Sequence, residues 1–496
     1  MRSLRVVLPV AVVAAALSGC AVSPKPFTDA EVLSLAKDDY SRVTADQEPV
    51  SGPIDLYEAM ARALKYNLDQ RVEAMGAALR IQELDLAHFS MLPSIVATSG
   101  YSARNNVNAS DSLNISTGLF SLPYSTSEDE RLRRADINFS WDILDFGLSY
   151  VRARQAADKY LAAQEQRRKV VARVIEDVRT AYWRAVSADR LISRLSELEA
   201  RSERAIANAH ASEADHLTSP ITAATYEREL IEIKRSIGEL QRDLSVARTQ
   251  LAALMNVQPG TPFALSGTAS APGLTLTLPL GKMIETALVN RPELHDVWYQ
   301  RRINDRELDA ALLEVLPGLS PYVGSNYDSN DFLYNANWVS WGAKASWNLL
   351  KLVQYPAKRD VVEAQGEQLD ARALAVTMAV ITQVHVSRIR FLQLQRDFAT
   401  SNRYLAVQRR LLHLMRDEAS ADRASEQSLI REEMNTLVAE ARRDIAYAEL
   451  QNAFAGVYTA IGLDPYASDI DIRLGVKSLA DKLRSVWVER GEAHSG

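Results

Sequence analysis

Two hydrophobic periods follow one another between Ala135 and Val186. From Ala135 to Ile143 apolar and polar residues alternate strictly, which is the period of a strand with one apolar face. From Val171 to Ala209 the apolar residues instead recur every three or four positions, in a heptad pattern. This pattern predicts one helix from about Gly147 to Asn208, which spans roughly 90 Å at 1.5 Å per residue. The two periods together therefore predict an elongated molecule.

The same order of strand and long helix occurs twice in the chain. Two dipeptides recur 224 residues apart (287 − 63 and 316 − 92): Ala63-Leu64 recurs as Ala287-Leu288, and Leu92-Pro93 recurs as Leu316-Pro317. Three single residues recur 206 residues apart (347 − 141): Trp141 as Trp347, Ser219 as Ser425, and Pro259 as Pro465. The difference, 224 − 206 = 18, assigns the extra length to the first polar loop. The sequence is therefore a duplicated unit whose two helical hairpins have equal lengths.

The first residues resemble an export signal. Arg2 and Arg5 precede an apolar run that is too short to span a membrane, and Leu17-Ser18-Gly19-Cys20 follows it. Cys20 is the only cysteine, and its position resembles the lipobox of bacterial lipoproteins, which implies diacylglyceryl attachment and N-acylation (palmitate). An ordinary signal peptide with a chance cysteine is the alternative. Several acyl chains would anchor the protein stably to a membrane.

These features divide the chain into segments. A lipoprotein signal peptide (1–19) precedes an N-terminal tether (20–53) with at most one short helix near Asp29 to Lys37. Repeat 1 (54–258) holds a helix from Ile54 to Met91, two strands and a long helical hairpin. A linker rich in Gly, Pro and Thr (259–279) leads to repeat 2 (280–465), which holds the same elements, and a C-terminal segment (466–496) ends the chain.

Four strands are predicted in each chain, near Ile95, Phe139, Tyr322 and Ala345. The last strand has Trp341, Ala343, Ala345 and Trp347 on one face and polar residues on the other, as a membrane barrel requires. Because four strands cannot close a barrel and an open edge in lipid is unfavourable, we expect closure with other copies. Three copies would supply twelve strands. A soluble β-sandwich fragment on a coiled-coil lipoprotein is the alternative interpretation.

The duplicated order, with its strand end Trp141-Asp142-Ile143-Leu144-Asp145-Phe146-Gly147, resembles the TolC-like outer-membrane efflux proteins over nearly the whole mature chain. The resemblance implies a mixed, mainly α fold: a trimeric 12-stranded β-barrel in the outer membrane joined to a periplasmic α-barrel. It also implies an exit duct of a tripartite efflux pump or type I secretion system, with a periplasmic adaptor and an inner-membrane transporter as partners. The second repeat has Asn348-Leu349-Leu350-Lys351 and no Gly at the equivalent strand end, so we expect the two strand-to-helix joints to turn differently.

The resemblance also suggests functional positions. The family's periplasmic gate residues align with Ser428 and Arg431, neither of which is acidic, while Glu426, Glu432 and Glu433 lie within one turn. The turns between the helices of each hairpin are the expected adaptor contacts, because exposed loops on a rigid scaffold carry recognition. The candidate contact residues are His210, Glu213, Asp215, Ser219, Arg423 and Ser425.

Other chemistry has little support in the sequence. With 57 Lys plus Arg against 63 Asp plus Glu, the net charge of −6 offers no basic surface for nucleic acid. His210, Glu213, Asp215 and His216 do not have the spacing of a metal site, and a solvated turn is the preferred interpretation. No catalytic motif or cofactor motif occurs, so we expect no enzyme activity, no cofactor and no metal.

Two functions remain open at this stage. The first is a passive export duct in the outer membrane. The second is a non-conducting coiled-coil lipoprotein that acts as a periplasmic scaffold or adaptor. The sequence does not identify the exported substrate, because a drug, a metal ion, a polysaccharide or a protein would pass through the same kind of tube.

Overall fold

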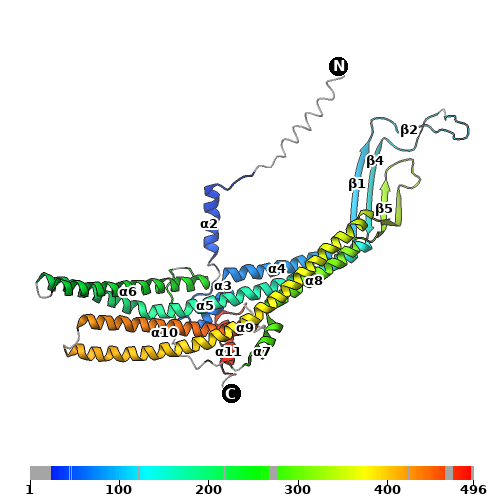
Figure 1. Cartoon of the computed structure of the whole chain (residues 1–496). Coiled ribbons are helices and arrows are strands. Elements are labelled where there is room, and N and C mark those ends of the chain that lie inside the picture. The colour runs from blue at the N-terminus through cyan, green and yellow to red at the C-terminus, as the bar shows by residue number, and fades with distance from the viewer. Residues whose placement is uncertain are drawn as a thin grey trace.

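The computed structural model describes residues 24–492 except 44, 46, 121–122, 216–218, 259, 267–273, 275, 277, 422–424 and 464–472. Cys20, His216 and Arg423, which carry predictions, lie outside the described residues. The molecule is elongated, with a β-sheet at one end, the turns of two helical hairpins at the other, and two long helices running between them (Figure 1). This arrangement agrees with the elongated molecule that the hydrophobic pattern predicts and with the mixed, mainly α fold that the resemblance implies.

The two repeats have helices of equal length, as the constant offsets predict. The long helices α5 (Ile143–Ala214) and α9 (Leu349–Ser420) each contain 72 residues. The returning helices α6 (Pro220–Leu254) and α10 (Glu426–Ala460) each contain 35 residues. The helices before the strands also match, with 11 residues in α3 (Leu56–Tyr66) and α7 (Leu280–Asn290) and 22 in α4 (Leu68–Phe89) and α8 (Pro292–Leu313).

The four predicted strands form one antiparallel sheet in the order β1-β4-β5-β6. Their bounds are Ser94–Ala103, Arg131–Ser140, Gly318–Asp328 and Asn337–Ser346. Paired residues share a face, so Phe139, Val323 and Trp341 lie together on the apolar face. On the opposite face Asn326 donates a hydrogen bond to Ser340 (2.9 Å). The sheet therefore has the one apolar and one polar face that the alternation predicts.

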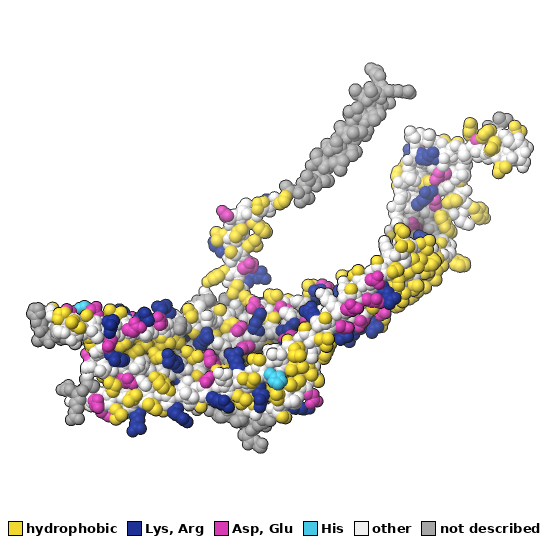
Figure 2. Space-filling view, viewed as in Figure 1, with side chains coloured by type: hydrophobic (Ala, Val, Ile, Leu, Met, Phe, Trp, Pro, Cys, Tyr) yellow, Lys and Arg dark blue, Asp and Glu magenta, His cyan; other side chains and the backbone are white. Residues whose placement is uncertain are grey.

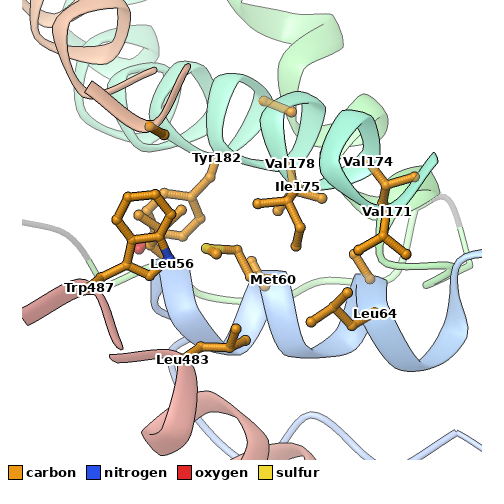
Figure 3. Packing of buried hydrophobic residues seen from close by; sticks show 14 of the residues in the cluster. Leu56, Met60, Leu64, Val171, Val174, Ile175, Val178, Tyr182, Leu483 and Trp487 are labelled. Carbon is orange, nitrogen blue, oxygen red and sulfur yellow. The ribbon is translucent and has the colours of Figure 1, made fainter. Parts of the chain in front are cut away.

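The main core lies where α3 and the C-terminal helix α11 (Val476–Glu492) pack on the middle of α5 (Figure 3). Met60 and Leu64 of α3 point toward Val174 and Val178 of α5, and Leu483 of α11 lies on the other side of α3. All of these side chains are at most 3% exposed. A second cluster, around Leu191, Leu230 and Leu437, continues along the hairpins. Burial of these stripes holds the two repeats together.

Several predicted elements need correction. The predicted helix Ile54–Met91 is two helices, because Asn67 leaves helical geometry (ψ 129°) and its side chain accepts a hydrogen bond from the Gln70 amide to cap α4. The short tether helix extends further than expected, as α2 (Asp29–Val43). The C-terminal segment contains α11, which packs mainly on α3 and whose apolar pattern is too weak to predict a helix. The first polar loop also contains a small hairpin of β2 (Ala109–Ser110) and β3 (Ser125–Thr126).

The prediction that the two strand-to-helix joints turn differently is wrong. Asp142 and Asn348 occupy equivalent positions, both have extended geometry, and both accept hydrogen bonds from helical amides two or three residues later. Gly147 lies inside α5 rather than in the turn, next to the side chain of Leu313 on α8. Both joints are therefore N-capped helix starts, and the glycine serves helix packing.

Candidate functional site at the ends of the helical hairpins

The returning helices of both hairpins begin with the same local chemistry. Ser219 precedes α6 and accepts a hydrogen bond from the Thr222 amide, and Ser425 precedes α10 and accepts one from the Ser428 amide. Serine is a favoured N-cap because its hydroxyl satisfies an amide that has no partner within the helix. The two expected adaptor-contact serines are thus structural caps that fix where each returning helix begins.

Three carboxylates of α10 face arginines of α5. Glu433, Glu440 and Asp444 form ion pairs with Arg201, Arg194 and Arg190, respectively. The Glu440 and Asp444 side chains are 6% and 7% exposed, so each carboxylate is enclosed by its partners. Burial lowers the pKa of Arg190, and the nearby charge of Glu440 opposes that shift. We call these three pairs the ionic ladder.

The long helix α9 completes the ionic ladder from the other side. Arg409 lies 3.1 Å from Glu440, and Arg416 lies 3.1 Å from Glu433. The spacing of seven residues within each helix (440 − 433, 201 − 194 and 416 − 409) places successive pairs on one face. Each glutamate therefore joins both long helices, so the first hairpin is tied to the second.

Closer to the turns, Arg431 of α10 forms an ion pair with Glu229 of α6, and Gln427 donates a hydrogen bond to the same carboxylate. These residues border a cavity of about 660 Å³ between α5, α6 and α10. The small side chains of Ala205 and Ala223 contribute to its wall. The hairpin ends thus meet through a polar contact that borders an open cavity.

The residues predicted to form a periplasmic gate have distinct positions in the structure. Ser428 belongs to the N-cap of α10, and Arg431 contacts the neighbouring hairpin through Glu229. Glu432 accepts a hydrogen bond from Gln408 of α9, and Glu433 belongs to the ionic ladder. The structure therefore brings Arg431, Glu432 and Glu433 to contacts between helices.

The other predicted tip residues are not gathered into one site. His210 lies 3.2 Å from Glu227 of α6, Glu213 is near the end of α5, and Asp215 follows that helix as its C-cap. Among the residues that the structure describes, no group of three His, Cys, Asp or Glu side chains has the arrangement of a metal site.

The ionic ladder was missed at the level of sequence. A signal was present, since Arg194 and Arg201, Arg409 and Arg416, and Glu433 and Glu440 each recur after seven residues. Charges at such spacing are common on solvated helix faces, however, so the pattern gains meaning only when α10 is known to lie between α5 and α9.

The elements form one curved layer with two free edges. Contacts give the order α4-α5-α8-α9 near the sheet and α6-α5-α10-α9 near the hairpin ends, and the sheet follows as β1-β4-β5-β6. Within the described chain, α9 is long and apolar enough to cross a membrane by length and composition alone. Only 17% of the most apolar window of α9 is buried, so most of that window is exposed in the single chain. Its exposed apolar side chains lie along one edge of this layer and gather over its start, beside the sheet (Figure 2).

No protein-family model and no curated protein sequence matches this chain. Solved structures do match. A CusC structure, described for folding and transmembrane channel formation, has a TM-score of 0.62 at 18% identity over 85% of this chain and 96% of that chain. The CmeC outer membrane channel of Campylobacter jejuni gives 0.63 at 13% identity over 94% and 98%. The open MtrE outer membrane channel of Neisseria gonorrhoeae gives 0.61 at 16% identity over 82% and 89%.

The fold is therefore that of the TolC-like outer-membrane channels, as the duplicated sequence order predicts. At these low identities the similarity establishes the fold, and the function has to be argued from the residues of this chain.

Proposed function

We propose that this protein is an outer-membrane exit duct that passively conducts substrate from an inner-membrane transporter and adaptor to the exterior. The observation that carries the proposal is the pair of free edges of the layer. One edge is formed by β1, α4 and α6, and the other by β6 and α9, so each edge continues from the sheet to the hairpin ends. Because the two edges are different surfaces, copies join head to tail, and such contacts close a ring when the rotation permits.

Three copies would supply twelve strands, within the range of outer-membrane barrels. The sheet suits this use, because its apolar face carries exposed Ile137, Val339 and Trp341 while its other face carries hydrogen-bonded polar side chains. A single sheet in lipid would leave the outer edges of β1 and β6 unpaired, at several kcal/mol for each backbone group. Closure with two further copies removes both edges.

The anchor and the location follow from the same proposal. Acylated Cys20 would hold the N-terminal tether at the outer membrane, with the helices extending into the periplasm. The protein's role is then transport without catalysis. Either a tripartite efflux pump or a type I secretion system would use such a duct.

The hairpin ends would form the periplasmic entrance and the docking surface for the adaptor. The contact between Arg431 and Glu229 and the cavity beside it support this assignment, because the contact ties two hairpins that have to separate for a wide opening. Ser428 and Glu432 flank the contact, and His210, Glu213, Asp215, Ser219, Arg423 and Ser425 would lie on the rim.

Conductance in planar bilayers tests the proposed duct. We expect the purified protein to form trimers with small conductance and Arg431→Ala to increase it, because that variant loses the contact between hairpins. Arg442→Ala, at an exposed position of the same helix, is the matched control. If the trimer and its Arg431 variant both fail to conduct, and Cys20→Ala is soluble without detergent, the protein is the coiled-coil scaffold instead.

A further inference from the structure

Strand β4 carries arginines on both faces at the loop end of the sheet, which is the end away from the helices (Figure 1). Three of its first four residues are arginines, and the alternating apolar segment that starts at Ala135 follows them. All ten residues of β4 pair with β1 in one unbroken register. Because only a bulge would change the alternation, the two faces defined further along β4 extend to its first residue.

The arginine on the polar face is engaged by two carboxylates. Arg134 is the cross-strand partner of Asp328, and its guanidinium lies 2.8 Å from that carboxylate. The carboxylate of Glu128, in the loop that leads into β4, lies 3.2 Å from the same guanidinium. The polar face therefore compensates its positive charge within the chain.

The two arginines on the apolar face lack such contacts. Arg131 and Arg133 alternate in step with Ile137 and Phe139, so their side chains leave β4 on the apolar face. Both are exposed, and neither forms an ion pair with any residue that the structure describes. Two positive charges, about 7 Å apart along the strand, thus adjoin a surface that is otherwise apolar.

The distance from these arginines to the other end of the sheet matches the thickness of a membrane. Trp141 lies at the helix end of the apolar face, eight residues from Arg133 and ten from Arg131 (141 − 133 and 141 − 131). With about 3.4 Å per residue and a strand tilt of about 40°, these separations give heights of about 21 and 26 Å. The apolar band of an outer-membrane barrel is about 25 Å tall, so the arginines reach the lipid headgroups when Trp141 lies at the opposite interface.

Two tyrosines of the apolar face lie at the same level. Tyr101 is the cross-strand partner of Arg133, and Tyr327 is the partner of Ala135. Their exposed fractions are 64% and 42%. Tyrosine is enriched where hydrocarbon meets the headgroups, because its ring is apolar and its hydroxyl is polar. The tyrosines therefore support the same placement of the sheet in the membrane.

We propose that Arg131 and Arg133 bind the phosphate of a lipid headgroup in the outer leaflet, with Tyr101 beside the same lipid. The planar guanidinium groups match phosphate oxygens in bidentate pairs. This inference rests on the proposed outer-membrane location and adds a lipid site to it. A ring of three copies would carry three such sites on its outer surface.

The position on the outer face selects a lipid over a transported solute. An anion on the polar face meets Arg134 already engaged by Asp328 and Glu128. An arginine on the lipid-facing surface of a barrel is strongly unfavourable at the middle of the membrane and nearly neutral at the interface. A phosphate bound there makes that position favourable, because a charge-assisted hydrogen bond is stronger where water is partly excluded.

Binding of diphosphoryl lipid A, a glycolipid with two phosphates, to the full-length protein in detergent tests the site. We expect Arg133→Gln to weaken this binding at least about tenfold, because hydrogen bonds between charged groups are lost, and Arg131→Gln added to it to weaken binding further. Arg133→Lys keeps the charge without the planar fork and should give an intermediate affinity. The matched control, Lys344→Gln, removes an exposed positive charge from the polar face of β6 and should leave binding unchanged.

The remaining outcomes overturn the site. Unchanged binding in Arg133→Gln would place the lipid elsewhere, and equal weakening by Lys344→Gln would show that net charge alone attracts it. Inorganic phosphate that displaces the lipid at equal concentration would assign the arginines to a soluble anion. Native mass spectrometry adds a count, since the trimer should retain up to three lipid A molecules and the trimer of the double variant should retain none.

The proposed duct and the lipid site fail in different ways. A conducting trimer that binds lipid A no more tightly than phosphatidylcholine overturns the lipid site, and the duct stands. A protein that does not conduct, and whose Cys20→Ala variant is soluble without detergent, has no sheet in a membrane, so both proposals are then wrong.

Discussion

Replacing Glu440 by Gln removes the central negative charge of the ionic ladder and keeps the shape of the side chain. Glu440 lies between Arg194 of α5 and Arg409 of α9, so the substitution leaves two arginines facing each other across a neutral amide. We expect α10 to lose part of its hold on both long helices. The rest of the hairpin core, including Leu437, stays unchanged.

The size of the effect follows from the exposure of the three partners. The Glu440 side chain is 6% exposed, but those of Arg194 and Arg409 are 44% and 60% exposed, so water screens the arginines and leaves the carboxylate enclosed. Removing one partner of a buried pair costs about 3–5 kcal/mol, and an exposed pair is worth about 0.2–1 kcal/mol. An intermediate loss of about 2 kcal/mol corresponds to roughly a 30-fold larger population of separated hairpins.

Hydrogen exchange followed by mass spectrometry measures this population. Amides of α10 between Glu426 and Asp444 should exchange about 30-fold faster in Glu440→Gln, while amides of α3 keep their protection. Glu449→Gln, at an exposed position of the same helix, is the control and should leave exchange unchanged. Equal exchange in the two variants would refute the idea that the ionic ladder holds the hairpins together.

Two further predictions concern the middle of the molecule. Gly462 has a positive φ of 78°, and a Cβ there would lie 2.6 Å from the Asn290 carbonyl carbon, so Gly462→Ala should lower the melting temperature whereas Gly456→Ala, with open space around it, should not. Hydrogen bonds from Lys65 and from the Val476 amide lower the pKa of Glu48, so the stability that Glu48 contributes is present at neutral pH and is lost as the pH falls through the lowered pKa. Thermal melts of the wild type and Glu48→Gln should therefore differ at pH 7 and converge in acid, and a constant difference would contradict this linkage.

The sequence by itself determined the repeated plan of the molecule. A period of two followed by a heptad period specifies a strand and then a long helix, because only those backbones place apolar side chains on one side at these spacings. The offsets of 224 and 206 residues then gave the equal lengths of α5 and α9, since a repeat fixes distances along the chain without any knowledge of contacts. The four strands of the sheet followed in the same way.

The tertiary structure alone decided which charged faces meet. A glutamate such as Glu440 has the same local pattern as a solvated residue, and it becomes an ionic contact only because α10 lies between two long helices. Gly147 shows the same limit of sequence reasoning. Its place after the strand suggested a turn between strand and helix, but it lies inside α5 and packs beside Leu313. Periodicity identifies the buried face of one helix, whereas the identity of the covering surface depends on contacts between residues hundreds of positions apart in the chain.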